Sequence, residues 1–113
     1  MNSDPGLVLV VDDNVINRDM LARRLQRKDF TVVTAENGSQ ALELIGSRDF
    51  DIVLLDVMMP GIDGLEVLET IRRSRSVADL PVIMATANDR SEDVVRALQL
   101  GANDYVTKSA LQN

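Results

Sequence analysis

The sequence contains neither cysteine nor histidine. Without cysteine, the chain can form no disulfide, no thiolate nucleophile and no zinc–thiolate site, and it is compatible with a reducing compartment. Without histidine, it can build no Ser-His-Asp or Cys-His catalytic machinery and no histidine-based metal site. Any catalytic or metal-binding site in this chain must therefore use carboxylate, hydroxyl and amine groups.

Long apolar stretches are also missing. No uninterrupted apolar run approaches the length needed to cross a bilayer, which argues against a membrane protein. The first residues, Met1 to Gly6, have neither the basic flank nor the apolar stretch of a secretion signal, so we expect a cytoplasmic location. The net charge of −6 argues against binding to a nucleic-acid backbone. We therefore expect no membrane and no direct nucleic-acid partner.

A length of 113 residues with 45% hydrophobic residues suits a globular protein with a single core, so we predict one domain over residues 1–113. Helical spacing of apolar residues occurs around residues 16–25, 41–45, 65–71 and 94–98. Strands alternating with helices need right-handed crossovers, which predicts an α/β fold with a doubly wound parallel sheet. The expected strands are Leu7–Val11, Thr31–Ala35, Ile52–Leu55, Val82–Ala85 and Asp104–Thr107.

The end of the chain does not fit a complete version of such a fold. Only residues 108–113 follow the last expected strand, too few for a helix of the typical ~11 residues. We therefore expect a domain truncated after its fifth strand, with one sheet face carrying only the first helix. The apolar surface left there must be covered by something else, and the chain is expected to come from a longer protein.

Polar residues stand where the expected strands end. In open parallel sheets, ligands bind beyond the carboxyl ends of the strands. If the strand order is two-one-three-four-five, three carboxylates, a hydroxyl and an amine converge on one edge. They belong to Asp12 and Asp13 after the first strand, Asp56 after the third, Thr86 after the fourth and Lys108 after the fifth.

Such a group of carboxylates needs a compensating cation, because like charges repel at close range. Mg²⁺ is the natural candidate, since it prefers hard oxygen ligands and keeps several waters in a shallow site. Lys108 would add a second positive charge. Together, Mg²⁺ and the Lys108 ammonium could neutralise the negative oxygens of an incoming phosphoryl group. Thr86 could donate a hydrogen bond to that group, and Asp56 is a competent nucleophile toward phosphoryl donors.

Each of these residues also has a purely structural explanation. Adjacent aspartates such as Asp12 and Asp13 often cap the helix that follows. Thr86 alone is an ordinary β-branched strand residue, and Lys108 alone an ordinary solvated lysine. Tyr105, the sole tyrosine, fits a half-buried strand aromatic. Only the conjunction of these residues is specific.

Four blocks of sequence resemble the receiver domain of two-component response regulators, of which the chemotaxis receiver is an example. They are Val10–Asn14, Leu54–Gly64, Ala85–Ala87 and Gly101–Lys108, and together they span nearly the whole chain. The resemblance implies a flavodoxin-like, five-stranded sheet in the order 2-1-3-4-5. It also implies that Asp56 accepts a phosphoryl group from a phosphohistidine on a histidine kinase or phosphotransfer protein. Such a domain is not an enzyme in the usual sense and catalyses only its own phosphorylation and dephosphorylation.

The resemblance assigns roles to individual residues. Asp13 and Asp56 would bind Mg²⁺ directly, and the backbone carbonyl of Met58 would be a further ligand. Asp12 would act mainly through bound water. Lys108 would hold the phosphoryl oxygens.

The resemblance also implies a switch and its partners. Thr86 would turn toward the new phosphate while Tyr105 moves inward, and the readout surface would lie on the fourth helix and fifth strand, facing an output domain or effector protein. Members of the family usually have proline where this chain has Ser109. The peptide bond that helps to orient the Lys108 side chain therefore differs from that of the family. The missing final helix predicts a homodimer or completion by a partner.

Two other functions remain open at this point. The chain could be a receiver-like interaction module that is never phosphorylated. It could also be a Mg²⁺-dependent phosphohydrolase. Enzymes that resemble the haloacid dehalogenase family, however, have a second aspartate two residues after the nucleophile, and Met58 occupies that position here. A nucleotide or flavin binder is disfavoured, because no glycine-rich phosphate fingerprint follows the first strand.

Overall fold

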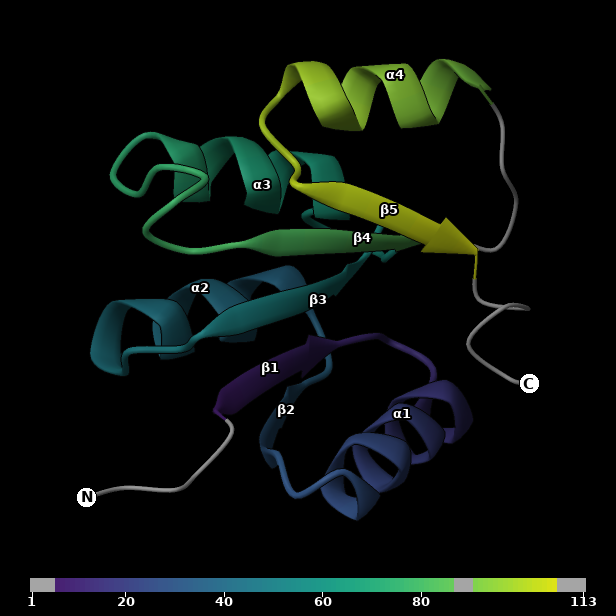
Figure 1. Cartoon of the computed structure of the whole chain (residues 1–113). Coiled ribbons are helices and arrows are strands. Elements are labelled where there is room, and N and C mark those ends of the chain that lie inside the picture. The colour runs from purple at the N-terminus through teal and green to yellow at the C-terminus, as the bar shows by residue number, and fades with distance from the viewer. Residues whose placement is uncertain (1–5, 87–90, 108–113) are drawn as a thin grey trace.

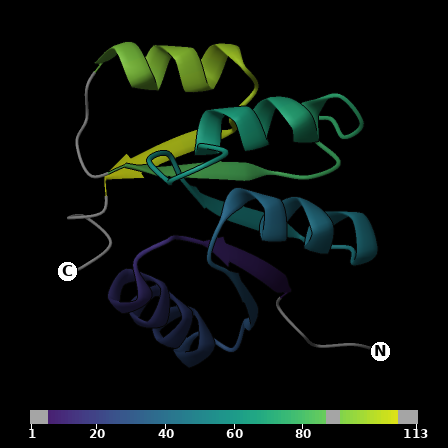
Figure 2. The ribbon, with the colours of Figure 1, turned by 180° about the vertical axis from the view of Figure 1, so that it is seen from behind.

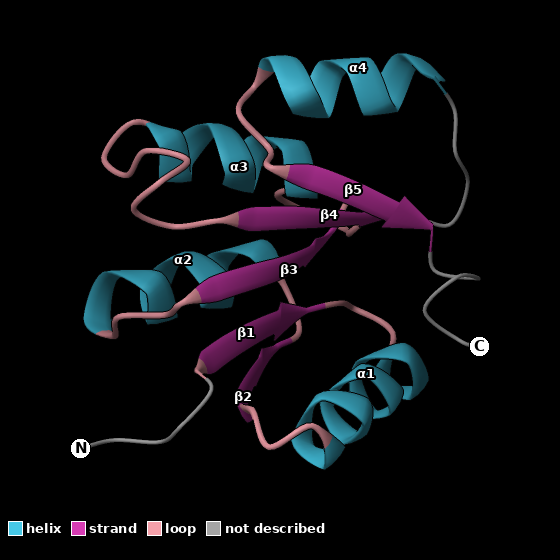
Figure 3. Ribbon diagram, in the orientation of Figure 1, coloured by secondary structure: helices cyan, strands magenta, loops and turns pink. Residues whose placement is uncertain are grey.

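Nine secondary-structure elements alternate along the chain in the computed structural model, which describes residues 6–86 and 91–107 (Figures 1 and 3). The strands are β1 (Leu7–Val11), β2 (Thr31–Ala35), β3 (Ile52–Asp56), β4 (Val82–Thr86) and β5 (Asp104–Thr107). The helices are α1 (Val15–Arg27), α2 (Gly38–Ser47), α3 (Gly64–Arg72) and α4 (Ser91–Gln99). Among the described residues, no helix is both long and apolar enough to cross a bilayer.

The five strands form one parallel sheet in the order β2-β1-β3-β4-β5. This confirms the doubly wound, flavodoxin-like α/β fold expected from the sequence. All five expected strands are present, and three have the expected bounds. The other two, β3 and β4, run one residue further, to Asp56 and Thr86. Both residues therefore end strands and lie at the carboxyl edge of the sheet.

The sheet separates two hydrophobic clusters. In β1, Leu9 and Val11 face the larger cluster, and Val8 and Val10 face the smaller one. Helices α2, α3 and α4 contribute to the larger cluster and α1 to the smaller. The two views agree, since α1, in purple, lies on one side of the sheet and α2 and α3 on the other (Figures 1 and 2). The β1 strand is thus buried on both faces, which explains its unbroken apolar sequence.

The α1 side of the sheet is incompletely covered by the described residues. A hollow of about 270 Å³ lies there, and every described side chain that lines it is apolar. The expectation of uncovered apolar surface on this face is thereby met within residues 6–86 and 91–107. Residues 108–113, including Lys108 and Ser109, lie outside the described residues. The lining residues are Val8, Leu25, Phe30, Ile52, Leu54, Ile83 and Val106.

Within the described residues, three helices begin with a side-chain cap. The side-chain oxygens of Asn14, Asn37 and Asp63 each accept a hydrogen bond from the backbone N–H three residues later. Each cap satisfies one of the backbone donors that the first turn of a helix leaves without an intrahelical acceptor. The caps fix where α1, α2 and α3 start, and two of them, Asn14 and Asp63, begin the helices that follow β1 and β3.

The side chain of Arg72, at the end of α3, makes hydrogen bonds to the loops that precede β4 and β5. Its guanidinium donates to the backbone carbonyls of Gly101 at 2.7 Å, Leu80 at 2.8 Å and Ser76 at 3.0 Å, and to Asn103 Oδ1 at 2.9 Å. Partial burial lowers the pKa of Arg72 below its ordinary value, but arginine stays protonated at neutral pH. Gly101 has φ of +105°, and a Cβ there would lie 3.0 Å from the Arg72 side chain. This cross-link joins α3 to the start of β4 and β5.

Candidate functional site

The parallel pairing of β1 and β3 brings two aspartates together. Val11 and Leu55 are register partners in these adjacent strands, and the next residues are Asp12 and Asp56. Each carboxylate is only 1% exposed, whereas Asp13 is exposed. Aspartate is seldom this deeply buried unless it is paired or coordinates a metal, so the burial makes this edge of the sheet a candidate functional site.

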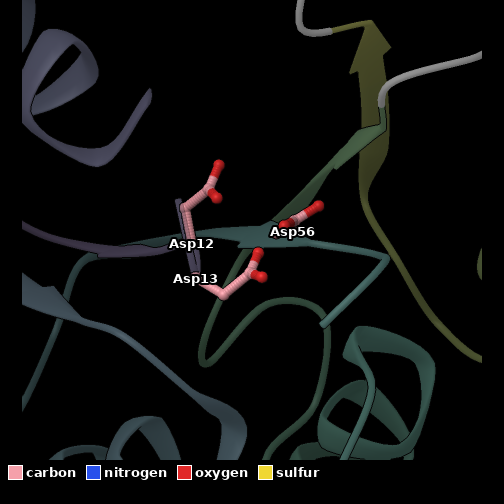
Figure 4. Close-up of side chains that lie close together, drawn as sticks. All are labelled: Asp12, Asp13 and Asp56. Carbon is pink, nitrogen blue, oxygen red and sulfur yellow. The ribbon is translucent and has the colours of Figure 1, made fainter. Parts of the chain in front are cut away.

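The three acids form one compact cluster. One carboxylate oxygen from each of Asp12, Asp13 and Asp56 lies within 4.8 Å of the other two. Figure 4 shows the three side chains at the carboxyl ends of β1 and β3. This is the arrangement that the sequence predicted for these residues, and the cluster could hold a metal ion.

The first turn of α1 holds Asp12 in place. The Asn14 N–H donates to Asp12 Oδ1 at 2.9 Å, and the Arg18 guanidinium donates to the Asp12 backbone carbonyl at 2.8 Å. The α1 cap is Asn14, whose side chain accepts from the Asn17 N–H at 3.0 Å. The structural alternative for the two aspartates, that they cap this helix, is therefore wrong.

The loop after Asp56 folds back over the strand end. The Met58 N–H donates to Asp56 Oδ1 at 3.3 Å, and the Gly64 N–H donates to the Val57 carbonyl at 2.9 Å. A Cβ on Gly64 would overlap the Asp56 backbone carbonyl, so this close return of the chain requires glycine. The Met58 side chain is 70% exposed beside the acidic cluster. The predicted role of the Met58 carbonyl as a metal ligand stays a prediction.

Two of the other predicted residues have a described place in the sheet. Ala85 is the register partner of Asp56, so the backbone of Thr86 lies one residue beyond that pair, opposite Thr107. The Thr86 side chain is outside what the structure describes, as is all of Lys108. Tyr105 is half-buried and packs against the larger core cluster. The switch role of Thr86 and Tyr105 stays a prediction.

Sequence reasoning missed three supporting residues. Asn14 could have been found, because asparagine just before a helical pattern is a preferred cap. The sequence around Gly64 indicates only a turn. The close contact of Gly64 with the Asp56 backbone cannot be predicted from the sequence beyond the presence of the glycine itself. The contact of Arg18 with the Asp12 carbonyl could not be predicted, because an arginine in a helix is usually exposed.

A family model described as "Response regulator receiver domain" matches residues 8–113. Solved structures agree with it. The receiver domain of response regulator 1452 from Francisella is 31% identical, with a TM-score of 0.84, and the match covers 92% of this chain and 84% of that one. The response regulator TrrA from Thermotoga maritima, solved in complex with Mg²⁺-BeF, is 38% identical, with a TM-score of 0.80 and coverage of 89% and 84%.

A third similar structure belongs to a much longer chain. NtrX from Brucella abortus is 34% identical, with a TM-score of 0.84, over 91% of this chain. The match covers only 23% of NtrX. The same fold therefore also occurs as one part of a larger polypeptide.

Proposed function

Because the chain belongs to the response regulator receiver domain family, we propose that it is a phosphoacceptor switch in which the Asp56 carboxylate receives a phosphoryl group. Receiver domains are signalling switches of two-component systems rather than metabolic enzymes. The observation that carries the proposal is the meeting of Asp12, Asp13 and Asp56 within 4.8 Å at the carboxyl edge of the sheet. Two of these carboxylates are buried, which is costly unless a cation joins them.

The acidic cluster suits Mg²⁺ in size and donor type. Mg²⁺–oxygen distances of ~2.1 Å mean that two oxygens bound to one ion lie at most about 4.2 Å apart. The observed spacing of up to 4.8 Å fits two direct carboxylates and a third that acts through water. We assign Asp13, Asp56 and the Met58 carbonyl as direct ligands and Asp12 as the water-mediated one. When bound, the ion neutralises charge on the phosphoryl oxygens. The Mg²⁺-BeF complex of TrrA supports this choice of metal.

The proposed chemistry is transfer from a phosphohistidine. An Asp56 carboxylate oxygen attacks the phosphorus, the phosphorus–nitrogen bond breaks, and the imidazole of the donor leaves and takes up a proton. Lys108 would hold the phosphoryl oxygens and Thr86 would donate a hydrogen bond to them. The Met58 N–H already donates to Asp56 Oδ1 and orients the carboxylate for attack.

The proposed output is a change of the surface formed by α4 and β5. Thr86 ends β4 and Tyr105 lies on the adjacent strand β5, so a new dianion beside Asp56 can bias both residues. The phosphodonor would be a histidine kinase or phosphotransfer protein, and the readout would pass to an output domain or effector protein. Residues 1–113 would act as one receiver domain within this pathway.

Intact-mass measurement after incubation with acetyl phosphate and Mg²⁺ tests the proposal. Wild type and Asp79→Asn, which alters an exposed aspartate in the loop before β4, should each gain one phosphoryl group, and Asp56→Asn should gain none. An unmodified but folded wild type would instead favour the interaction module. Sustained release of phosphate from an ester would favour the phosphohydrolase.

A further inference from the structure

The strand β2 forms one edge of the sheet. Within residues 6–86 and 91–107, β2 pairs with β1 and with no other strand (Figure 3). A strand that has a neighbour on one side only presents a row of backbone N–H and C=O groups on its other side, and a further strand can pair with them. The outer side of β2 is therefore a place where another chain could extend the sheet.

The hydrogen bonds between β1 and β2 determine which groups of β2 face outward. The Thr31 N–H donates to the Gly6 carbonyl at 3.0 Å, and the Ala35 carbonyl accepts at 3.1 Å from the N–H of the residue that follows β1. In a parallel ladder, the residues that bond to one neighbour alternate along the strand, so Thr31 and every second residue after it face β1. The backbone N–H and C=O groups of Val32 and Thr34 therefore point to the outer side.

The strand β2 lacks the features that usually prevent such pairing. Edge strands are commonly protected by a charged side chain, a proline or a bulge. The sequence of β2, TVVTA, contains no charged residue and no proline, and its pairing with β1 is unbroken over all five residues. Thr34 is exposed and Val32 is half-buried. The strand at the other edge, β5, differs because it begins with the charged residue Asp104.

The two ends of β2 carry opposite charges. Arg27 and Lys28, just before the strand, are exposed, and Asp29 offsets only one of their two positive charges. Glu36, just after the strand, is exposed, and Asp13 of the acidic cluster lies at the same edge of the sheet. An antiparallel second β2 brings the basic end of each strand to the acidic end of the other, whereas a parallel one would bring like charges together.

We propose that the outer side of β2 is a self-association surface, at which two copies of this chain pair their β2 strands in antiparallel orientation about a two-fold axis. Val32 of each copy lies opposite Thr34 of the other, and each of these pairs exchanges two hydrogen bonds. Val33 then lies opposite Val33 of the second copy. The pairing joins the two five-stranded sheets into one continuous sheet. It goes beyond the proposed function, because none of its hydrogen bonds involves the acidic site.

One introduced thiol tests the register, because the chain contains no cysteine. In the proposed pairing, Val33→Cys places two thiols in a non-hydrogen-bonded pair with Cα atoms about 4.5 Å apart, which a disulfide can bridge. Thr31→Cys, the control on the same side of the strand, places them about 14 Å apart along the strands. With oxidised glutathione, Val33→Cys should form a disulfide-linked dimer about tenfold faster than Thr31→Cys. Equal rates, or no dimer from Val33→Cys, would overturn the inference.

Sedimentation of Ile83→Asn separates this pairing from association through the apolar hollow, because the substitution places a polar group in that hollow. Ile83→Asn should still form a dimer as its concentration rises. Hydrogen exchange of the Val32 and Thr34 amides should slow over the same range of concentration, because these N–H groups become hydrogen-bonded. A monomer at every concentration, or exchange at these two amides that does not change with concentration, would overturn the inference.

Substitutions of Thr34 in the Ile83→Asn background test the outer side of β2 itself. Thr34→Lys adds a charge to the edge, and Thr34→Pro removes an outward-facing N–H while the bonds to β1 remain. Each should raise the dimer dissociation constant about tenfold or more, and Thr34→Val should leave it unchanged. Circular dichroism shows which variants are folded, and Thr34→Lys keeps the test decisive if Thr34→Pro does not fold. Dimerisation of folded Thr34→Lys as tight as that of Thr34→Val would overturn the inference.

Discussion

Asp12 and Asp56 lie side by side because each comes one residue after a register pair, Val11 and Leu55, of two adjacent parallel strands. Parallel strands end at the same edge, so the pairing of β1 with β3 is sufficient to bring the two carboxylates together. Both are almost fully buried, and Asp13 adds a third charge within 4.8 Å. The fold therefore brings three carboxylates to one point, where they could hold a metal ion.

Removing one of these charges should stabilise the metal-free protein. We expect Asp13→Asn to raise the free energy of unfolding by about 1 kcal/mol without Mg²⁺, because repulsion among the carboxylates falls. Millimolar Mg²⁺ should raise the melting temperature of wild type by mass action and that of Asp13→Asn much less. Thermal unfolding with and without Mg²⁺ measures both effects. An equal Mg²⁺ response in the two proteins would exclude Asp13 as a ligand.

Two glycine substitutions should have opposite effects. Gly64→Ala places a Cβ against the Asp56 and Val57 backbone, so we expect a loss of about 3 kcal/mol and impaired phosphorylation. Gly46→Ala in α2 meets nothing within 4 Å and should stabilise the protein by about 0.5–1 kcal/mol. Denaturant unfolding of both variants measures the difference. A harmless Gly64→Ala would show that the loop after Asp56 does not need the observed close return.

The sequence was sufficient to predict most of the fold. All five strands were found, because β-branched and aliphatic runs bounded by turn residues have few other interpretations. The apolar spacing around residues 94–98 predicted a helix there, and α4 of the structure, Ser91–Gln99, contains those residues. Composition and spacing do not specify the strand order, because pairing among distant strands is not encoded in local patterns. The family resemblance supplied that order instead.

The supporting residues of the site were harder to predict than the acids. Aspartates at strand ends stand out because they follow apolar runs, so Asp12, Asp13 and Asp56 were candidates by position, and their combination with the other strand-end residues made the prediction specific. The contact of Arg18 with the Asp12 carbonyl depends on the path of the chain between β1 and α1. The cross-link made by Arg72 joins residues about thirty positions apart. Such contacts follow from tertiary packing and carry no local signature.

That cross-link should be important for stability. Arg72→Met keeps an unbranched apolar side chain but loses the bonds to Gly101, Leu80 and Asn103, so we expect a loss of about 2 kcal/mol. Hydrogen exchange should rise at the start of β4 and β5. Arg73→Met, which removes an exposed arginine 3.8 Å from Glu69, should cost less than about 0.5 kcal/mol. Similar losses in the two variants would contradict the role given to Arg72.

The apolar hollow on the α1 side of the sheet should make a chain of these 113 residues prone to associate. Light scattering at several concentrations should show a mean mass that rises with concentration. Ile83→Asn, which places a polar group in the hollow, should reduce the rise. A compact monomer at every concentration would count against the expectation.

Chemical trapping of the modified residue tests the central claim most directly. After incubation with acetyl phosphate and Mg²⁺, borohydride reduces an aspartyl phosphate to homoserine, and peptide mass spectrometry then locates the change. The account predicts homoserine at position 56, dependent on Mg²⁺ and strongly reduced in Asp13→Asn. Trapping at another aspartate, or equal trapping at position 56 when Mg²⁺ has been removed by a chelator, would contradict it.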